Sequence, residues 1–347
     1  MPSPRLTLSD LAARLKVSAT TISNAFNRPD QLSRTLRERI LTEAAALGFS
    51  GPDETARSLR TGKTFVIGVV LPESLSWYFE DAVASQFLGG VSQVLDAAGY
   101  RLLLLPETSL GDGRRVPAVD GVIIYGVGYN GQLATSFQQQ GKPVVGVEVA
   151  FPDTPTVLIN DEQTTYEITR WSLANTPSRY EPLIVSLHVE RWQHSTDLPA
   201  LAQSRRLNAM HRALREAGHD PAMIPVVDTH DITHSGLEKT LPAWLRQGEP
   251  RLLLCMSDSL ALTALELVEQ YGLKVPEDIR LTGFDGINEG QRRSPQLTTV
   301  YQDSRGKGAS AARMVLGTQS CQQLTLDGFL IYGESCPPRL NSHAWQE

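Results

Sequence analysis

The first fifty residues place apolar side chains at the spacing of an α-helix. The i, i+3, i+4, i+7 pattern of a buried helix face runs through Leu8, Leu11, Ala12 and Leu15. Thr7 stands directly before this run, at the position of an N-cap. The pattern therefore predicts a short amphipathic helix that begins after Thr7.

A second short helix is predicted only two residues further on. Ser18 stands at its N-cap position, and Ile22 and Phe26 share one apolar face because they are four residues apart. The opposite face carries small or amide-bearing side chains without charge: Ala19, Thr20, Ser23, Asn24 and Asn27. Such groups suit contact with base edges and phosphates in a major groove. Two short helices joined by so tight a turn predict a helix-turn-helix.

A third helix completes the predicted head of the chain. Ser33 caps it and Gly48 ends it. The three helices are expected to close a core of Leu8, Leu11, Leu15, Ile22, Phe26, Leu36, Ile40 and Leu47. Residues 53–60 follow between two chain-breaking stretches and are too few for a stable isolated helix, so they are expected to form a linker that orders on binding.

From Phe65 onward the pattern changes to alternating strands and helices. Residues 65–71 form a continuous apolar run, which is typical of a strand buried on both faces. Further strands are predicted at 100–105, 121–125, 144–149, 183–186, 226–227, 252–255 and 279–283, and a helix at 87–98. Helices between most of these strands imply parallel sheets with right-handed crossovers. So many strands over about 280 residues predict two doubly wound lobes.

Residues that follow the strands are the candidate ligand contacts, because ligands of such lobes bind outside the carboxyl ends of the strands. The candidates are Trp77, Tyr78, Phe79, Tyr125, Glu148, Ser257 and Asp285. Each has a structural alternative. The aromatic residues 77–79 could be core or dimer contacts, Glu148 could be a solvated strand end, and Asp285 could cap the turn after its strand.

Charge is distributed unevenly along the 347 residues. Residues 1–63 carry ten basic and six acidic groups, whereas the rest of the chain has a net charge of −10. A basic head on an acidic body suggests that the head meets a polyanion. No apolar run approaches the roughly 18 residues of a membrane span, and no signal peptide opens the chain, so we expect a cytoplasmic protein without membrane contact. The three cysteines lack CxxC spacing and are expected to be reduced.

Two motifs suggest other chemistry. The stretch GVGYNG at 126–131 matches a GxGxxG fingerprint and would make the chain an NAD-dependent oxidoreductase. It follows the third strand of its lobe, whereas such fingerprints belong to the first strand–helix turn, so we expect no cofactor and no enzyme. His230 and His234 are four apart but lie in a loop, so no metal site is predicted.

Three stretches of the chain resemble the LacI/GalR family of bacterial transcription repressors. They are "LTLSDLAARLKVSATTISNAFN", "LRERILTEAAALGF" and "ARSLRTGKTFVIGVVLP". Further on, "LLLCMSDSLALTALELVEQYGLKVPEDIRLTGFDGI" resembles the second effector lobe of that family. The resemblance covers nearly the whole chain.

The resemblance implies a set of DNA contacts. Thr20 and Asn24 match base-reading positions, with Ala19 and Thr21 beside them. Matches to phosphate-contacting positions are Thr7, Ser18, Ser23 and Asn27, and Arg57 is expected to contribute to the salt dependence of binding. Leu59 matches the hinge leucine that wedges into the minor groove, supported by Ala56.

The resemblance also implies effector contacts. Arg206 matches the arginine that donates to the effector, and Ser257 and Asp285 match effector-site positions; Asn160 and Asp161 are weaker candidates. The chain departs from the family pattern in three places. An extra residue and Asp53 change the start of the hinge, Asn24 replaces a common arginine, and the segment 106–118 is short and is expected to lack a full helix.

These observations together predict an α plus α/β protein with a helix-turn-helix head, a hinge helix and a two-lobed body like a periplasmic binding protein. The domains are expected at 1–50, 51–63 and 64–347, with lobes of about 64–160 plus 294–322 and 161–293 plus 323–340. The expected function is a homodimeric repressor that binds a palindromic operator and responds to a small effector, with a sugar favoured over a nucleobase. The alternatives are the oxidoreductase and a solute-binding protein without DNA function.

Overall fold

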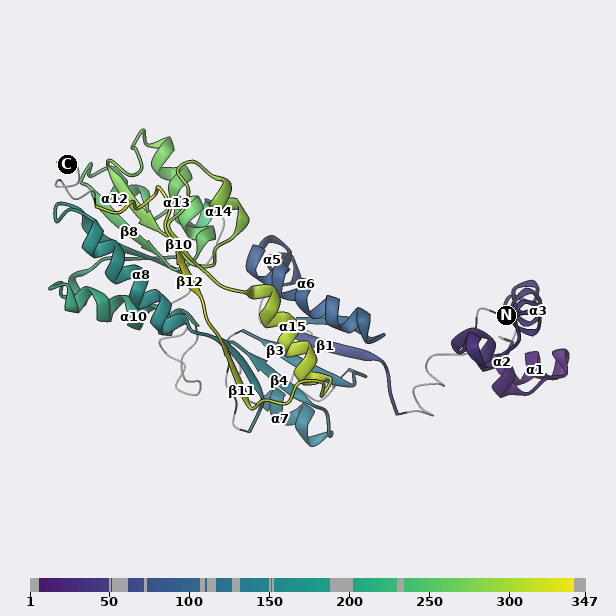
Figure 1. Ribbon diagram of the computed structural model, residues 1–347. Coiled ribbons are helices and arrows are strands. Elements are labelled where there is room, and N and C mark those ends of the chain that lie inside the picture. The colour runs from purple at the N-terminus through teal and green to yellow at the C-terminus, as the bar shows by residue number, and fades with distance from the viewer. Residues whose placement is uncertain are drawn as a thin grey trace, which may run out of the picture. The chain divides into compact units, whose positions relative to one another are not determined.

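The computed structural model divides the chain into two compact units, Met1–Phe65 and Val66–Glu347. It describes residues 6–49, 51, 62–71, 74–106, 110, 117–126, 132–149, 151, 153–187, 202–229 and 234–339. The first unit is the predicted head and the second is the predicted body (Figure 1).

The described part of the head contains three α-helices, each started by a side-chain cap. They are α1 (Leu8–Leu15), α2 (Ala19–Asn27) and α3 (Arg34–Ala46). Thr7 forms a reciprocal capping box with Asp10, and the Ser18 hydroxyl accepts a hydrogen bond of 3.0 Å from the backbone N–H of Thr21. Ser33 caps α3 in the same way. The predicted caps are therefore confirmed.

The head core contains the predicted apolar positions and several more, among them Phe49. Leu11, Leu15, Ile22 and Ile40 are buried, and the other predicted core residues are partly buried around them. Phe49 was not predicted, and its ring lies edge-on to Phe26 with centroids 5.8 Å apart.

Two basic side chains of α3 connect the three helices of the head. Arg37 Nε donates to the carbonyl of Ala25 at 3.1 Å, and Arg39 Nη2 donates to the carbonyl of Leu15 at 3.0 Å. These bonds satisfy carbonyls near the ends of α1 and α2, where the helices leave acceptors unpaired. Part of the positive charge of the head therefore holds the helices together.

The first lobe is built on a six-stranded parallel sheet in the order β11-β5-β4-β3-β1-β2. Its strands are β1 (Val66–Leu71), β2 (Arg101–Pro106), β3 (Gly121–Tyr125), β4 (Val144–Val147), β5 (Thr156–Ile159) and β11 (Gln323–Leu326). The helices are α5 (Leu75–Glu80), α6 (Ala82–Ala97), α7 (Gln132–Gln139) and α15 (Ser304–Val315). Helix α6 begins earlier than predicted because the Asp81 carboxylate caps its first turn.

Both faces of this sheet are covered. Ile67 and Val69 pack with α6 and α15 on one face, whereas Val70 packs with α7 on the other (Figure 1). This alternation explains why the first strand reads as a continuous apolar run. Helices α6 and α15 touch so closely that a Cβ at Gly90 would lie 2.0 Å from the Arg305 carbonyl oxygen.

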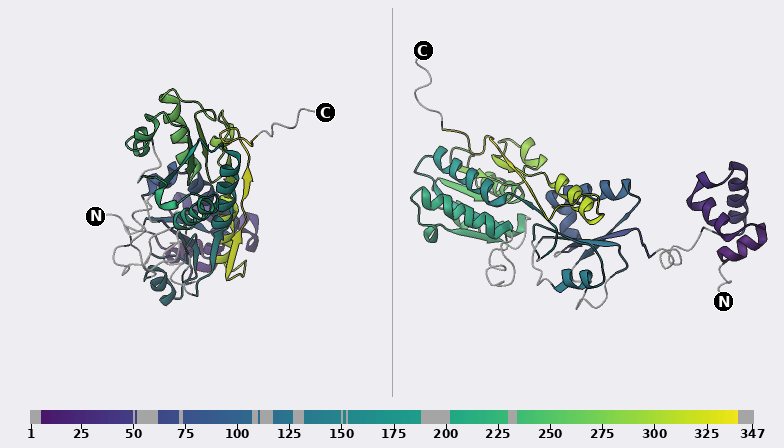
Figure 2. Two further views of the ribbon diagram at one scale, coloured as in Figure 1. Left: turned by 90° about the vertical axis from the view of Figure 1, so that its left-hand side faces the viewer. Right: turned by 60° about the horizontal axis from the view of Figure 1, so that its bottom comes forward.

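The second lobe is built on a four-stranded parallel sheet in the order β7-β6-β8-β9. Its strands are β6 (Glu181–Leu187), β7 (Val226–Thr229), β8 (Arg251–Cys255) and β9 (Ile279–Thr282). The helices are α8 (Asp161–Asn175), α10 (Ala202–Glu216), α11 (His234–Leu237), α12 (Pro242–Leu245), α13 (Asp258–Gln270) and α14 (Asn288–Arg292). Figure 2 shows α8 and α10 side by side, and the two helices are in contact.

Three segments connect the lobes. The chain passes from β5 to α8 at Asn160, returns through β10 (Thr299–Tyr301) to α15, and crosses again from β11 to β12 (Phe329–Ile331). Strands β10 and β12 pair antiparallel between the lobes (Figure 1). The assignment of 323–340 to the second lobe was therefore wrong for β11. This strand pairs with β5 at the edge of the first sheet, and its short, weakly apolar sequence shows no preference for either lobe.

The fold class predicted from the sequence is confirmed: a helical head precedes a body with two doubly wound parallel sheets. The predicted strands are all present with small changes of their ends, while β5, β10, β11 and β12 were not predicted. Most of the segment 106–118 lies outside the described residues, so the expected loss of its helix stays a prediction. No helix among the described residues is long and apolar enough to cross a membrane.

Candidate functional site

Seven side chains between the two lobes form a closed ring of hydrogen bonds and ion pairs. They come from the ends of β4, β9 and β10 and from three helices, and we call them the interlobe ring. Its members are Glu148, Asp161, Arg205, Arg206, Asp285, Gln302 and Lys307. The carboxyl ends of the parallel strands meet here, which is where ligands of doubly wound sheets bind.

Asp161 is the centre of the second-lobe side of the ring. It is the first residue of α8 and is almost completely buried. Its Oδ1 accepts a hydrogen bond of 3.0 Å from Arg206 Nε, and its Oδ2 accepts one of 2.7 Å from Arg205 Nη2. A carboxylate in the first turn of a helix is also stabilised by the helix dipole. Asp161, a weaker candidate from the sequence, is therefore hydrogen-bonded to Arg206, a stronger one.

Arg206 makes further contacts through its guanidinium. Nη1 donates to the Met256 carbonyl at 2.7 Å and lies 3.6 Å from Asp285 Oδ1, and Cζ lies 3.7 Å from the centroid of the Phe284 ring. Burial alone would lower the pKa of Arg206, but Asp161 and the other nearby carboxylates raise it above its usual value. The guanidinium is thus a fixed cation with a planar set of donors.

Glu148 and Lys307 form the first-lobe side of the ring. Lys307 Nζ lies 2.5 Å from Glu148 Oε1 and donates to Gln302 Oε1 at 3.0 Å. The other oxygen of Glu148 lies 3.4 Å from Arg205 Nη2, so an ion pair joins the lobes. Glu148 is buried and has a φ of +59°, a backbone conformation that costs energy for a residue with a Cβ. The alternative of a solvated strand end does not hold.

Asp285 closes the ring. Gln302 Nε2 donates to its Oδ1 at 2.5 Å, and its φ of +128° is again in a region that side chains rarely adopt. Burial raises the pKa of Asp285 to about 8, partly opposed by the charge of Arg206 and reinforced by Asp258 and other carboxyls. Near neutral pH this group can therefore donate or accept a hydrogen bond.

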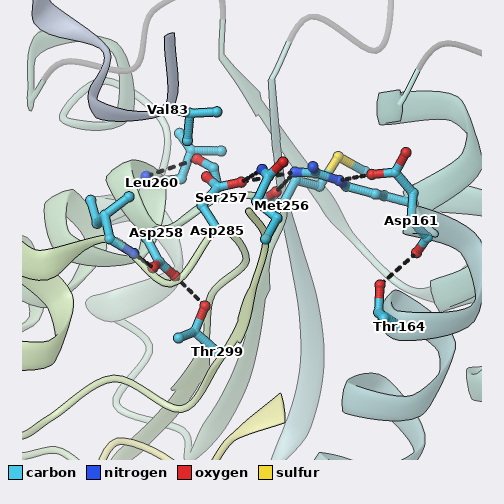
Figure 3. Close-up of polar contacts among 12 residues, drawn as sticks. Val83, Asp161, Thr164, Met256, Ser257, Asp258, Leu260, Asp285 and Thr299 are labelled. Atoms are coloured by element: carbon cyan, nitrogen blue, oxygen red, sulfur yellow. Dashed lines mark hydrogen bonds and ion pairs between the residues drawn. The ribbon is translucent and has the colours of Figure 1, made fainter. Parts of the chain in front are cut away.

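Asp258, rather than Asp285, holds the turn after β9. Its Oδ2 accepts a hydrogen bond of 2.9 Å from the backbone N–H of Ile287, and its Oδ1 one of 2.5 Å from Thr299 Oγ1 (Figure 3). Burial raises the pKa of Asp258 to about 6 in spite of these bonds. Asp258 thus connects α13 to strand β10. The carboxyl group of Asp285 makes its contacts within the ring instead.

The aromatic candidates have different environments. Tyr78 is buried, Trp77 packs against the cores of both lobes, and Phe79 is 66% exposed. The indole Nε1 of Trp77 is buried and has no hydrogen-bond partner among the described residues. Tyr125 is buried, stacks on Phe87 at 4.2 Å, and has a pKa raised well above its usual value by burial and by nearby carboxyls. Of the three residues 77–79, only Trp77 contacts both lobes.

Ser257 lies next to the ring but caps a helix. Its hydroxyl accepts a hydrogen bond of 3.2 Å from the backbone N–H of Leu260, at the start of α13 (Figure 3). Asp81, which was not predicted, caps α6 in the first lobe. Burial raises the pKa of Asp81, while Lys307 and Arg206 act to lower it, so this carboxyl is electrostatically coupled to the ring.

The predicted DNA-contacting residues of the head lie on one side of the helix-turn-helix. Thr7, Ser18, Ala19 and Thr20 are exposed, and Thr21, Ser23 and Asn24 are partly exposed. The opposite side of α2 is buried through Ile22 and Ala25. Ala56, Arg57, Leu59 and the side chain of Asn27 lie outside the described residues.

Sequence reasoning missed three members of the ring: Arg205, Gln302 and Lys307. Lys307 could have been found, because it is the one charged residue in the run GKGASAA and shares its helix face with Ala311 and Met314, both buried. The others carry no such signal. Gln302 follows a strand that the sequence did not predict.

The GxGxxG stretch and the histidine pair lie only partly within the described residues. Residues 127–131 of the glycine-rich stretch and the side chains of His230 and His234 lie outside the described residues. Within the described part of the chain, no group of three or more His, Cys, Asp or Glu side chains could hold a metal ion.

A helix-turn-helix head and a two-lobed body with a polar site between the lobes define a class of protein: a DNA-binding regulator with a ligand-binding body. Comparison with known proteins agrees. Residues 193–336 match the model of the periplasmic binding protein-like domain family. The chain is 38% identical over 332 residues to the HTH-type transcriptional regulator Rv3575c of Mycobacterium tuberculosis, covering 91% of each chain.

Solved structures are also similar. A LacI family transcriptional regulator from Corynebacterium glutamicum matches with a TM-score of 0.68 and 26% identity, covering 95% of this chain and 98% of the other. The lac repressor dimer bound to operator and an anti-inducer shares the fold, with a TM-score of 0.73 and 20% identity over 95% of this chain and 99% of the other. The chain belongs to the LacI/GalR family of transcriptional regulators.

Proposed function

We propose that the chain is a homodimeric repressor whose affinity for a palindromic operator is changed by a small effector bound at the interlobe ring. One observation carries the effector part. Glu148, Arg206 and Asp285 are separated by 58 or more residues in the sequence, yet they belong to one ring of contacts between the lobes. A ligand seated there touches both lobes and so binds one arrangement of the lobes better than another.

The chemistry of the ring favours a neutral ligand rich in hydroxyl groups. The ring contains three carboxyl groups and three cations, so it offers many donors and acceptors without a large excess of either charge. The buried, unpartnered Nε1 of Trp77 supplies a further donor between the lobes. Sugars and other polyols fit these groups, and a nucleobase is the competing ligand class.

The DNA part rests on α2. Its exposed side carries Ala19 and Thr20, with Asn24 one turn further, while its apolar side is buried in the head. An asparagine can bond adenine through two atoms in the major groove. One such helix reads few bases, so two subunits on a palindrome supply the specificity. Phe79, which is exposed on α5, is a candidate dimer contact.

The first experiment is selection of bound sequences from a random DNA pool by the full chain at moderate salt. The expected result is a pseudo-palindrome with a flexible central step. If no sequence is enriched, the selection is repeated with a mixture of metabolites. A protein that enriches nothing in either selection contradicts the repressor function.

The effector is tested by thermal unfolding in the presence of a panel of neutral sugars, polyols and purine bases. A ligand of this site raises the Tm of the wild type and of Arg212→Met, but not of Arg206→Met. Arg212 is a matched control because it lies on the same helix but contacts Glu162 and the Tyr166 ring rather than any member of the interlobe ring. A ligand that stabilises Arg206→Met equally binds elsewhere.

A further inference from the structure

Lys307 is a buried lysine on a helix that close packing against its neighbour holds in place. Its side chain is 1% exposed. It lies between Gly306 and Gly308 on α15, and a Cβ at Gly308 would lie 2.0 Å from the carbonyl oxygen of Phe87 on α6. Helix α6 thus meets the backbone of α15 on both sides of Lys307, at Gly308 and, through Gly90, at Arg305. The ammonium has a fixed place in the first lobe.

The ammonium satisfies its charge through two side chains. Glu148 Oε1 lies 2.5 Å away and Gln302 Oε1 lies 3.0 Å away, and the Tyr125 ring centroid is 5.7 Å from Nζ. A buried charge of this kind is costly unless it is paired and hydrogen-bonded. The ammonium of Lys307 consequently fixes the positions of the Glu148 and Gln302 side chains.

Each of these two partners contacts the second lobe with its other end. Glu148 Oε2 is paired with Arg205 on α10. Gln302 Nε2 donates to Asp285 after β9. The amide oxygen of Gln302 accepts a hydrogen bond from the ammonium of Lys307. The NH₂ group of the same amide must therefore point toward Asp285. Lys307 thus determines the two contacts that run from the first-lobe side of the ring to the second lobe.

We propose that Lys307 is the positioning residue of the effector site and holds the two lobes in the arrangement that the ring defines. This inference rests on the proposed function. An effector that binds between the lobes must replace some of the contacts of the ring. The pair Arg206–Asp285, at 3.6 Å, is the longest contact of the ring and is the one that a ligand replaces first. This arrangement of the lobes, and hence the affinity for the operator, depends on a residue that the effector need not touch.

The test is a double-mutant cycle on operator affinity without added ligand, with the full chain and the operator found by selection. Lys307→Met, Asp285→Ala and the double variant are compared by fluorescence anisotropy. Lys307→Met and Asp285→Ala are each expected to weaken binding at least fivefold, because each removes a contact between the lobes. The double variant is expected to bind within twofold of Lys307→Met, because Asp285 is already released when Gln302 is no longer oriented. A buried lysine with a merely structural role would give factors that multiply.

The matched control is Arg313→Met, which removes an exposed cation from the same helix and is expected to bind like the wild type. If Lys307→Met does not fold, Lys307→Met/Glu148→Gln replaces it in the cycle, because it removes both charges of the buried pair. A loss of less than fivefold, a gain in affinity, or factors that multiply would overturn the inference. A wild type that binds no selected DNA contradicts the proposed function instead.

Discussion

Arg206 Nε lies 3.0 Å from Asp161 Oδ1, and this bond joins the α10 helix of the second lobe to the residue at which the chain enters that lobe. The neighbouring Arg205 binds the other oxygen of the same carboxylate. Two consecutive arginines thus hold one buried aspartate, and each also has a contact beyond it: Arg205 with Glu148 and Arg206 with Asp285. The two arginines are therefore expected to contribute unequally to the stability of the folded chain.

Arg206→Met is expected to lower the free energy of unfolding by about 3 kcal/mol, the order seen when one partner of a buried ion pair is removed. The change leaves the Met256 carbonyl without its donor and the Phe284 ring without its cation. Arg205→Met is expected to cost less, since Asp161 keeps Arg206 and Arg205 is the more exposed of the two. Urea unfolding of both variants checks the order. Equal losses would contradict the unequal roles.

The close contact between α6 and α15 predicts opposite effects at two adjacent glycines. Gly90→Ala places a Cβ 2.0 Å from the Arg305 carbonyl oxygen, so the helices must separate, and a loss of about 1–3 kcal/mol is expected. Gly89→Ala meets only the end of the flexible Arg305 side chain at 3.3 Å. It is expected to be neutral or stabilising by up to about 1 kcal/mol, because alanine favours the helix.

Denaturant unfolding of the two variants in parallel measures this difference. Gly89→Ala is the control for any general effect of an added methyl group in α6. If both variants unfold at the wild-type midpoint, the backbone contact that fixes Lys307 in the first lobe is looser than the distances indicate.

Asp285→Asn is expected to change the pH dependence of stability. The pKa of Asp285 is raised to about 8 in the folded chain, above the value of about 4 for an unfolded aspartate. The folded state therefore keeps a proton that the unfolded state loses, and this contribution to stability disappears as the pH rises from about 4 to about 8. The isosteric amide does not titrate, so stability should fall less over this range.

Thermal unfolding of both proteins from pH 5 to pH 9 provides the measurement. The difference between variant and wild type should grow up to about pH 8 and then become constant. Asp258, with a pKa raised to about 6, titrates in both proteins, so the comparison rests on the range from about pH 7 to pH 8, above that pKa. Parallel curves would show that Asp285 titrates normally.

Asn24→Ala is expected to relax the sequence preference of the operator at one position, with a loss of about 1–3 kcal/mol of discrimination between bases. Arg57→Ala, in the hinge, should instead weaken all sequences alike and lower the salt slope by about one. Competition binding against single-base variants of the selected operator, at several salt concentrations, separates the two effects. If both changes weaken all sequences equally, the placement of the recognition helix is wrong.

Local sequence patterns were sufficient for the head and for the main strands. Caps at Thr7, Ser18 and Ser33 act within three residues, so neighbouring residues alone decide them. The buried strands were visible because both faces of a parallel sheet are covered. The short strand β11 was assigned to the wrong lobe, since its four residues alternate weakly and its partner β5 lies more than 160 residues earlier.

The amino-acid sequence by itself determined the order of elements, the helix-turn-helix and the positions after the strands where a ligand would bind, because periodicity, capping and chain topology are local properties. Only the tertiary structure decided which of those positions meet. Lys307 and Glu148 are 159 residues apart, and their contact depends on how α15 packs on α6 and on a strained backbone at Glu148. Burial then raised the pKa of Asp285, because the folded chain removes water from its carboxyl group.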